Sequence, residues 1–234
     1  MNVLALDTSG PVAGVAVASE GLIRYEAAVR NGLTHSVNLM PMMEEALTRS
    51  GLALKDMDLI AVTVGPGSFT GVRLGVEAAK ATAHVLDIPC LGVDALEATA
   101  LNITGFEGVI CPIQDARAQQ VYGAAFSGPD HKRLMEDAPM PLTDYADAVE
   151  GFFKPLMFLG DGTLKYREWL ADRFPEPGRV FFAPSEHNYL RPAAVAAWAM
   201  RHPERKVSWQ DLMPLYLRPP QAERQRNLVE RAHG

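Results

Sequence analysis

The residues with the clearest potential for chemistry lie in a glycine-rich segment, 65–71, which reads Gly-Pro-Gly-Ser-Phe-Thr-Gly. It separates an apolar run from a predicted helix, and the backbone N–H groups of such a loop can hold an anion. The segment lacks the Gly-Lys-Ser/Thr ending of a Walker loop and the G-x-G-x-x-G spacing of a dinucleotide fingerprint. From these residues alone, a tight structural turn is at least as good an interpretation as a phosphate site.

Two aspartates could complete a site beside this loop. Asp7, followed by Thr8, ends the first apolar run, and Asp115 ends a later one. In open α/β sheets, ligands bind beyond the carboxyl ends of the strands. The candidate residues for a nucleotide or anion are therefore Asp7, Thr8, Gly65, Gly67 and Asp115. Asp-Thr-Ser after a strand is also ordinary turn capping, and the residues alone favour that interpretation.

Other catalytic patterns are missing from the sequence. The six histidines show no H-E-x-x-H pattern, and no Cys/His cluster has the spacing of a zinc site. No serine lies in a G-x-S-x-G elbow. The sequence therefore predicts no catalytic residue set and no metal site.

The elements that must position these residues follow a repeated order. Strands are predicted at 2–7, 12–18, 22–28, 59–64 and 89–93, with helices at 36–50, 72–86 and 94–102. A weaker copy has strands at 109–114, 119–126, 133–138, 156–159 and 180–183, with helices at 142–150, 164–172 and 192–200. Two tandem βββαβα units predict an α/β protein with two lobes of related topology. The predicted boundaries are 1–105 for the first lobe, 106–220 for a degenerate second lobe, and 221–234 for a polar tail.

Two predicted helices of the first lobe have faces suited to packing. Gly71, Gly75 and Ala79 recur every four residues, although glycine inside a helix costs about 1 kcal/mol relative to alanine. Helix 36–50 has more apolar residues than one stripe requires, and several are methionines, which adapt to irregular binding surfaces. Packing on the chain's own sheet and docking of a partner's helices are both open for these faces.

Composition narrows the class of protein. The chain has 234 residues, 48% hydrophobic and 21% charged, with a net charge of −6. A protein that grips nucleic acid alone usually has a basic face, so any contact with RNA is expected to depend on a partner. No apolar run approaches the roughly 20 residues of a membrane span, and the N-terminus lacks a basic leader region. Cys90 and Cys111 lie in apolar segments as expected for reduced thiols, so the expected location is the cytoplasm.

Three segments carry a resemblance to a known family. Residues 3–9, 35–41 and above all 65–75 (Gly-Pro-Gly-Ser-Phe-Thr-Gly-Val-Arg-Leu-Gly) are similar to the bacterial TsaB family, also called YeaZ. Residues 113–117 and 216–218 resemble later landmarks of that family. The glycine motif is specific to TsaB and its paralogue TsaD. The resemblance implies the actin/hexokinase-like, ribonuclease H-like (ASKHA) fold.

The resemblance also implies a role without catalysis. TsaD holds a metal in a segment like Gly-Val-Asn-His-Leu-Glu-Gly-His, whereas residues 92–99 read Gly-Val-Asp-Ala-Leu-Glu-Ala-Thr. Ala95 and Thr99 stand at the two histidine positions, and neither can replace an imidazole ligand. The resemblance therefore implies a non-catalytic subunit for threonylcarbamoylation of the tRNA adenosine at position 37, beside the anticodon.

The expected partners follow from the same resemblance. The chain is expected to dimerise with and activate TsaD together with the ATPase TsaE, to form homodimers when alone, and to meet tRNA only within the complex. No cofactor of its own is expected, and a nucleotide is expected only at the junction of the complex. The residues predicted to lie at the contact with TsaD are Leu39, Met43, Gly71, Gly75 and Ala79.

Three alternatives remain open at this point. One is a glycoprotease-like metallopeptidase, which needs a bound metal. Another is an ATPase or sugar kinase of the same fold, with Asp7 and Asp115 around a magnesium nucleotide. The last is a purely structural homodimer.

Overall fold

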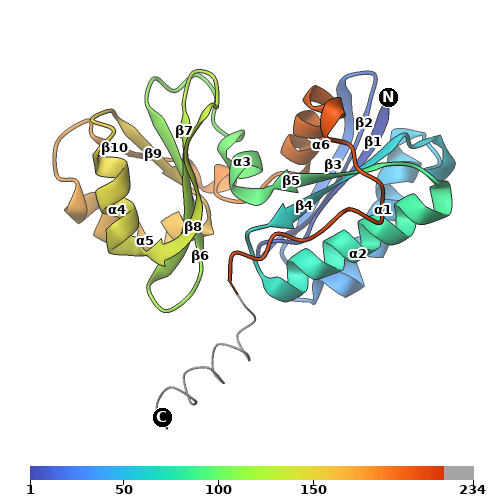
Figure 1. Cartoon of the computed structure of the whole chain (residues 1–234), viewed down its shortest axis with the longest axis horizontal. Helices are drawn as coiled ribbons and strands as arrows, with labels where there is room; N and C mark the ends of the chain where they lie inside the picture. Colours follow the sequence, from blue (N-terminus) through green and yellow to red (C-terminus); the bar gives the residue numbers. More distant parts are fainter. Residues whose placement is uncertain (219–234) are drawn as a thin grey trace, which may run out of the picture.

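The chain forms two α/β lobes placed side by side in a computed structural model, which describes residues 1–218 (Figure 1). The first sheet has the strand order β3-β2-β1-β4-β5. Its strands are β1 (Asn2–Asp7), β2 (Ala13–Ser19), β3 (Leu22–Val29), β4 (Leu59–Gly65) and β5 (Cys90–Asp94). The helices that follow the strands are α1 (His35–Ser50), α2 (Phe69–Leu86) and α3 (Ala95–Ala100), with a 3-10 turn at Leu54–Asp56.

The second sheet repeats this arrangement in the order β10-β9-β6-β7-β8. Its strands are β6 (Val109–Asp115), β7 (Gln120–Ser127), β8 (Arg133–Pro141), β9 (Leu156–Leu159) and β10 (Val180–Phe182). The remaining helices are α4 (Leu142–Glu150), α5 (Asp161–Arg173) and α6 (Pro192–Arg201), with 3-10 turns at Ser185–His187 and Pro203–Arg205. In each lobe the first three strands pair antiparallel, and the last two run parallel to the first. The duplicated topology predicted from the sequence is therefore confirmed.

Alternation along the strands sorts the apolar side chains of the first sheet between two cores. Leu4 and Leu6 of β1 lie in the core beneath α1 and α2. Val3 and Ala5, which point to the opposite face, lie in a core shared with α6. Both faces of the first sheet are thus covered by helices, as its nearly continuous apolar strands require.

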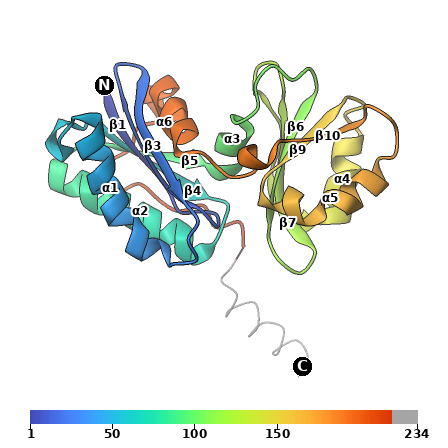
Figure 2. The same ribbon diagram turned by 180° about the vertical axis from the view of Figure 1, so that it is seen from behind.

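The short helix α3 lies between the two lobes (Figure 2). Ala95 and Ala98 belong to the core of the first sheet. Leu96 and Ala100 pack instead with residues of the second lobe, including the fully buried Phe126. One helix therefore supplies apolar side chains to both lobes and fixes how they meet.

The chain returns to the first lobe after the second sheet is complete. The sequence analysis assigned residues 106–220 to the second lobe, whereas the structure packs α6 on the first sheet, with Val195 and Ala196 fully buried there. Beyond α6, Val207 and Cys90 exchange two backbone hydrogen bonds of 2.9 Å. The predicted tail, 221–234, lies outside the described residues. None of the helices within residues 1–218 combines the length and apolar character needed to span a membrane.

Candidate functional site

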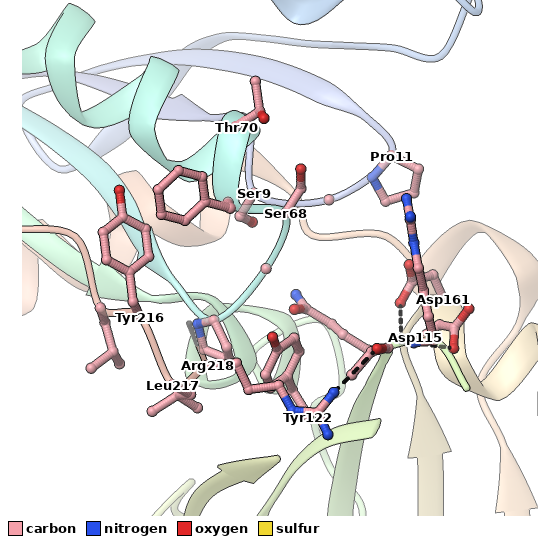
Figure 3. A pocket seen from close by; sticks show the side chains of 18 residues that line it. Ser9, Pro11, Ser68, Thr70, Asp115, Tyr122, Asp161, Tyr216, Leu217 and Arg218 are labelled. Carbon is pink, nitrogen blue, oxygen red and sulfur yellow. Dashed lines mark hydrogen bonds between the residues drawn. The ribbon is translucent and has the colours of Figure 1, made fainter. Parts of the chain in front are cut away.

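A cavity of about 560 Å³ opens between the lobes at the strand ends (Figure 3). It is lined by the loop after β1, the glycine loop after β4, the end of β6, and residues 215–218. Its polar lining side chains include Ser68, Thr70, Asp115, Tyr122 and Arg218. The cavity lies where ligands of open α/β sheets bind, at the carboxyl ends of the strands.

Asp7 is tied up within the first lobe and does not line this cavity. Only 2% of its surface is exposed, and its Oδ1 accepts hydrogen bonds from the backbone N–H and hydroxyl of Ser9, at 2.9 and 2.7 Å. The hydroxyl of Thr63 on β4 also donates to Oδ1. Burial raises the pKa of the Asp7 carboxyl, and the bonds from Thr63 and Ser9 partly offset that rise. These hydrogen bonds agree with the interpretation that Asp7 caps the turn after β1.

The glycine loop packs tightly against the loop after β1. A Cβ on Gly67 would lie 2.4 Å from the carbonyl oxygen of Ser9, and Ser68 donates its backbone N–H to the same oxygen at 2.8 Å. The Oγ of Ser68 caps α2 by accepting the N–H of Gly71, which starts the helix earlier than predicted. Thr8 donates its hydroxyl to the carbonyl oxygen of Gly71 at 2.7 Å. Close backbone approach therefore accounts for these glycines without any anion.

Gly65 packs against a segment near the end of the described chain to which the sequence analysis assigned no structural role. Residues 207–218, here called the strap, run back from α6 toward the cavity. The backbone N–H of Leu215 donates to the carbonyl oxygen of Val64 at 2.6 Å. A Cβ on Gly65 would lie 2.5 Å from the carbonyl oxygen of Leu215. Tyr216 stacks on Phe69, with ring centroids 4.6 Å apart. The strap has no hydrophobic periodicity, so the sequence indicated residues 216–218 only as a landmark of the family resemblance and not as a neighbour of Gly65.

Asp115 lies on the second-lobe side of the cavity. Its Oδ2 accepts from Lys165 Nζ at 2.8 Å, and its Oδ1 accepts from the hydroxyl of Tyr166 at 3.1 Å. Its backbone N–H donates to Oδ1 of Asp161 at 3.1 Å. Of the five residues proposed to hold a nucleotide or anion, Gly67 and Asp115 line the open cavity, whereas Asp7 does not. That role remains a prediction.

The five residues predicted to contact TsaD face the chain's own sheet instead. Leu39, Met43 and Ala79 lie in the core beneath α1 and α2, with at most 6% of their surface exposed. A Cβ on Gly71 would lie 2.1 Å from the carbonyl oxygen of Thr8, and one on Gly75 would lie 2.5 Å from its hydroxyl oxygen. The individual assignments are therefore corrected: the small residues let α2 approach β4 and the loop after β1, and they leave no surface for a partner.

The surface side of α1 is nevertheless apolar. Val37 is 57% exposed and Met40 is 51% exposed, and Leu33, just before the helix, is 56% exposed. Pro41 is also exposed beside them. These four residues form the α1 stripe. The excess of apolar residues in the sequence of this helix indicated that an exposed apolar stripe exists. The pattern did not show which of these residues point outward.

The positions at which the resemblance implied a lost metal site lie on α3. Ala95 is fully buried, and Thr99, 2% exposed, donates its hydroxyl to the carbonyl oxygen of Ala95 at 2.7 Å. Within residues 1–218, no group of three or more His, Cys, Asp or Glu side chains is placed to hold a metal ion.

Both cysteines are buried and unpaired, and burial raises the pKa of Cys90 to about 11.

Comparison with known proteins identifies relatives along most of the chain. A family model described as TsaD, tRNA N6-adenosine threonylcarbamoyltransferase, matches residues 28–223. The tRNA threonylcarbamoyladenosine biosynthesis protein TsaB of Bacillus subtilis (strain 168) is 34% identical over 225 residues, 95% of this chain and 96% of that protein. The protein of the same name from Escherichia coli (strain K12) is 35% identical over 131 residues, 54% of this chain and 55% of its own.

Solved structures agree with the sequence relatives. YeaZ from Pseudomonas aeruginosa superposes with a TM-score of 0.74 at 27% identity, over 92% of this chain and 99% of that chain. The ROK hexokinase of Thermus thermophilus has a TM-score of 0.50 at 14% identity, over 84% and 98% of the two chains, which is a likeness of fold alone. Together with the duplicated sheets, these matches confirm the predicted ASKHA fold.

Proposed function

Because the chain belongs to the TsaB family of tRNA threonylcarbamoyladenosine biosynthesis proteins, we propose that it serves this pathway as a non-catalytic partner of the TsaD transferase. The observation that carries the proposal is the packing of Ala95 and Thr99 on α3. Thr99 bonds to the backbone at Ala95, and both residues are packed between the lobes, where imidazole ligands would be needed for transferase chemistry. A member of this family that lacks the transferase chemistry would act by binding the subunit that carries it out, TsaD.

We place the contact with TsaD on the α1 stripe, with the exposed side of α2 beside it. Exposed apolar side chains grouped on one helix are typical of surfaces that are covered in an assembly. The methionine in the stripe adds adaptability, since its unbranched side chain can follow an irregular surface. The same surface would mediate homodimers of the isolated chain, so homodimer and heterodimer would be mutually exclusive.

The remaining parts of the proposal follow from this assignment. TsaE joins the pair, and tRNA is met only within the complex, since the chain itself carries a net charge of −6. A nucleotide would bind only at the junction of the complex, because Asp7 does not line the open cavity of the chain alone. The proposed place of action is the cytoplasm, where tRNA is modified.

Co-purification tests the proposal. Tagged TsaD should retain the untagged chain in a one-to-one complex, and the chain alone should elute as a homodimer that TsaD disrupts. Elemental analysis should find no stoichiometric zinc or iron in the purified chain, since either would support the metallopeptidase alternative. Failure of TsaD to retain the chain would support the purely structural homodimer. Tight ATP binding by the isolated chain, with turnover lost in Asp7→Ala, would support the kinase alternative.

A further inference from the structure

A second and much smaller cavity adjoins the open one, between the lobes and the segment that returns to the first lobe. Its volume is about 20 Å³, which is room for a single water-sized particle. Oxygen-bearing side chains from separate parts of the chain line it, among them those of Asp7, Thr99, Gln114, Asp161 and Asn188. Such a concentration of acceptor oxygens around one small space requires a partner that can satisfy them.

Two amide oxygens at this cavity have no hydrogen-bond partner within the described chain. Asn188 is 2% exposed, and its Nδ2 donates to the carbonyl oxygens of Ala183 and Pro184, at 3.4 and 3.1 Å. These two bonds fix the orientation of the amide, so its buried Oδ1 is an unsatisfied acceptor. Gln114 is 9% exposed, and its buried Oε1 also has no partner. Leaving a buried polar atom unpaired costs about 1–3 kcal/mol.

Two carboxylates, those of Asp7 and Asp161, face the same cavity. All three hydrogen bonds to Asp7 end on its Oδ1, which leaves Oδ2 as the oxygen that can meet a ligand. Asp161 accepts the backbone N–H of Asp115 through its own Oδ1. Within residues 1–218, neither carboxylate forms an ion pair, in contrast to Asp115, which pairs with Lys165. Burial raises the pKa of both Asp7 and Asp161; the charge of Asp115 adds to the rise at Asp161, whereas His35 partly offsets the rise at Asp7.

We propose that this cavity binds one divalent cation, Mg²⁺ or Ca²⁺, through the side-chain oxygens of Asp7, Gln114, Asp161 and Asn188. Carboxylate and amide oxygens are the ligands that these hard cations prefer. A single water has two protons to donate and would leave acceptors unsatisfied, whereas a cation is attracted to every oxygen around it. Mg²⁺ usually keeps several waters, so the small volume favours Ca²⁺ where both ions are present.

The proposed ion would join parts of the chain that are far apart in sequence. Asp7 belongs to the first lobe, Gln114 and Asp161 belong to the second, and Asn188 lies on the returning segment. The ion would therefore hold the lobes at a fixed separation next to the open cavity. It would be a structural ion, since its ligands come from both lobes and from the returning segment.

Thermal unfolding of the full chain, stripped with EDTA and then given Mg²⁺, Ca²⁺, Na⁺ or Zn²⁺, tests the proposal. The unfolding temperature should rise by several degrees with Mg²⁺ or Ca²⁺ and should keep rising with concentration, because a bound ion stabilises only the folded state. Isothermal titration should give one site per chain. Na⁺ at matched ionic strength should have no such effect.

Two matched variants locate the site. Asp161→Asn keeps the size of the side chain and the acceptor for Asp115 but removes a charge, and it should weaken cation binding at least tenfold. Asp115→Asn removes the adjacent carboxylate, which lines only the open cavity, so it should weaken cation binding far less than Asp161→Asn does. No cation-dependent shift in the wild-type chain would overturn the proposal in favour of a water-filled cavity. Equal loss in both variants would overturn it in favour of binding in the open cavity.

Discussion

The carbonyl oxygen of Thr8 lies where a side chain on Gly71 would begin, because a Cβ built on Gly71 would come within 2.1 Å of it. The two residues belong to the loop after β1 and the first turn of α2, and the hydroxyl of Thr8 also donates to the carbonyl oxygen of Gly71. The helix is thus held against the sheet at a separation that only glycine allows.

Replacing Gly71 with alanine should therefore destabilise the fold. In an unconstrained helix this change would stabilise the chain by up to about 1 kcal/mol. Here the clash with backbone should outweigh that gain and lower the free energy of unfolding by about 1–3 kcal/mol, as measured by urea denaturation. Gly10→Ala is the matched control, since no atom lies within 4 Å of its Cβ, and it should change stability by less than about 0.5 kcal/mol. Equal stability of both variants would contradict the packing argument.

Replacing Val37 with glutamate should abolish retention by TsaD without unfolding the chain. Val37 is 57% exposed in the α1 stripe, so its substitution should alter the free energy of unfolding by less than about 0.5 kcal/mol. At a contact with TsaD, however, a charge would be buried without a partner, which should reduce co-purification at least tenfold. Leu134→Glu, at an exposed position on β8, is the control and should bind normally. A normal complex with Val37→Glu would refute the assigned surface.

Replacing Arg133 with methionine should loosen the junction between the lobes. Arg133 of β8 contacts Asp137 in its own lobe and reaches Glu97 and Asp94 of the first lobe, at 3.2 and 3.6 Å. Its side chain is only 23% exposed, so its loss leaves the carboxylates of Asp137 and Glu97 without their cation. We expect the free energy of unfolding to fall by about 3 kcal/mol. Arg49→Met, which removes an exposed pair with Glu45, should change it by less than about 1 kcal/mol.

The pH dependence of stability should report on Asp94. Burial, then a hydrogen bond and repulsion from Asp137, hold the pKa of Asp94 well above its ordinary value of 3.8. The folded chain therefore binds more protons than the unfolded chain, and this group's contribution to stability is lost as the pH rises from about 4.

The variant Asp94→Asn separates this effect from the others. Asparagine can still accept the N–H of Glu97, which Asp94 caps at 2.7 Å, but it cannot ionise. Urea denaturation between pH 4 and pH 8 should show that the advantage of the variant over the wild type grows with pH. A constant difference between the two proteins across this range would show that Asp94 does not titrate in the folded state as described.

The repeated topology could be read from the sequence because each strand is a short apolar run and each helix is set off by turn residues. The sheet on which α6 packs could not be predicted from the sequence. The apolar face of this helix shows that it is buried, but it does not show against which sheet. The same limit explains the error over Gly75 and Ala79. Four-residue spacing shows that small residues share a face, yet only the fold reveals that this face packs on β4 and on the loop after β1.

The candidate site was predictable only in part. Asp7 and Asp115 were correctly placed at the ends of the first strand of each lobe. Asp161 and Asn188 were not found, because oxygen ligands gathered from distant loops leave no spacing pattern in the sequence. The strap was missed for a similar reason, since it is held by backbone hydrogen bonds and one aromatic stack.

Reconstituted tRNA modification measures most directly whether this chain is a required partner without catalysis of its own. Purified TsaD, TsaE and this chain would be incubated with unmodified tRNA and the small-molecule substrates of threonylcarbamoylation, with each protein omitted in turn. We predict full modification only with all of them present, none from this chain without TsaD, and none when Val37→Glu replaces the wild type. Full modification in the absence of this chain, or any modification by this chain in the absence of TsaD, would contradict the account.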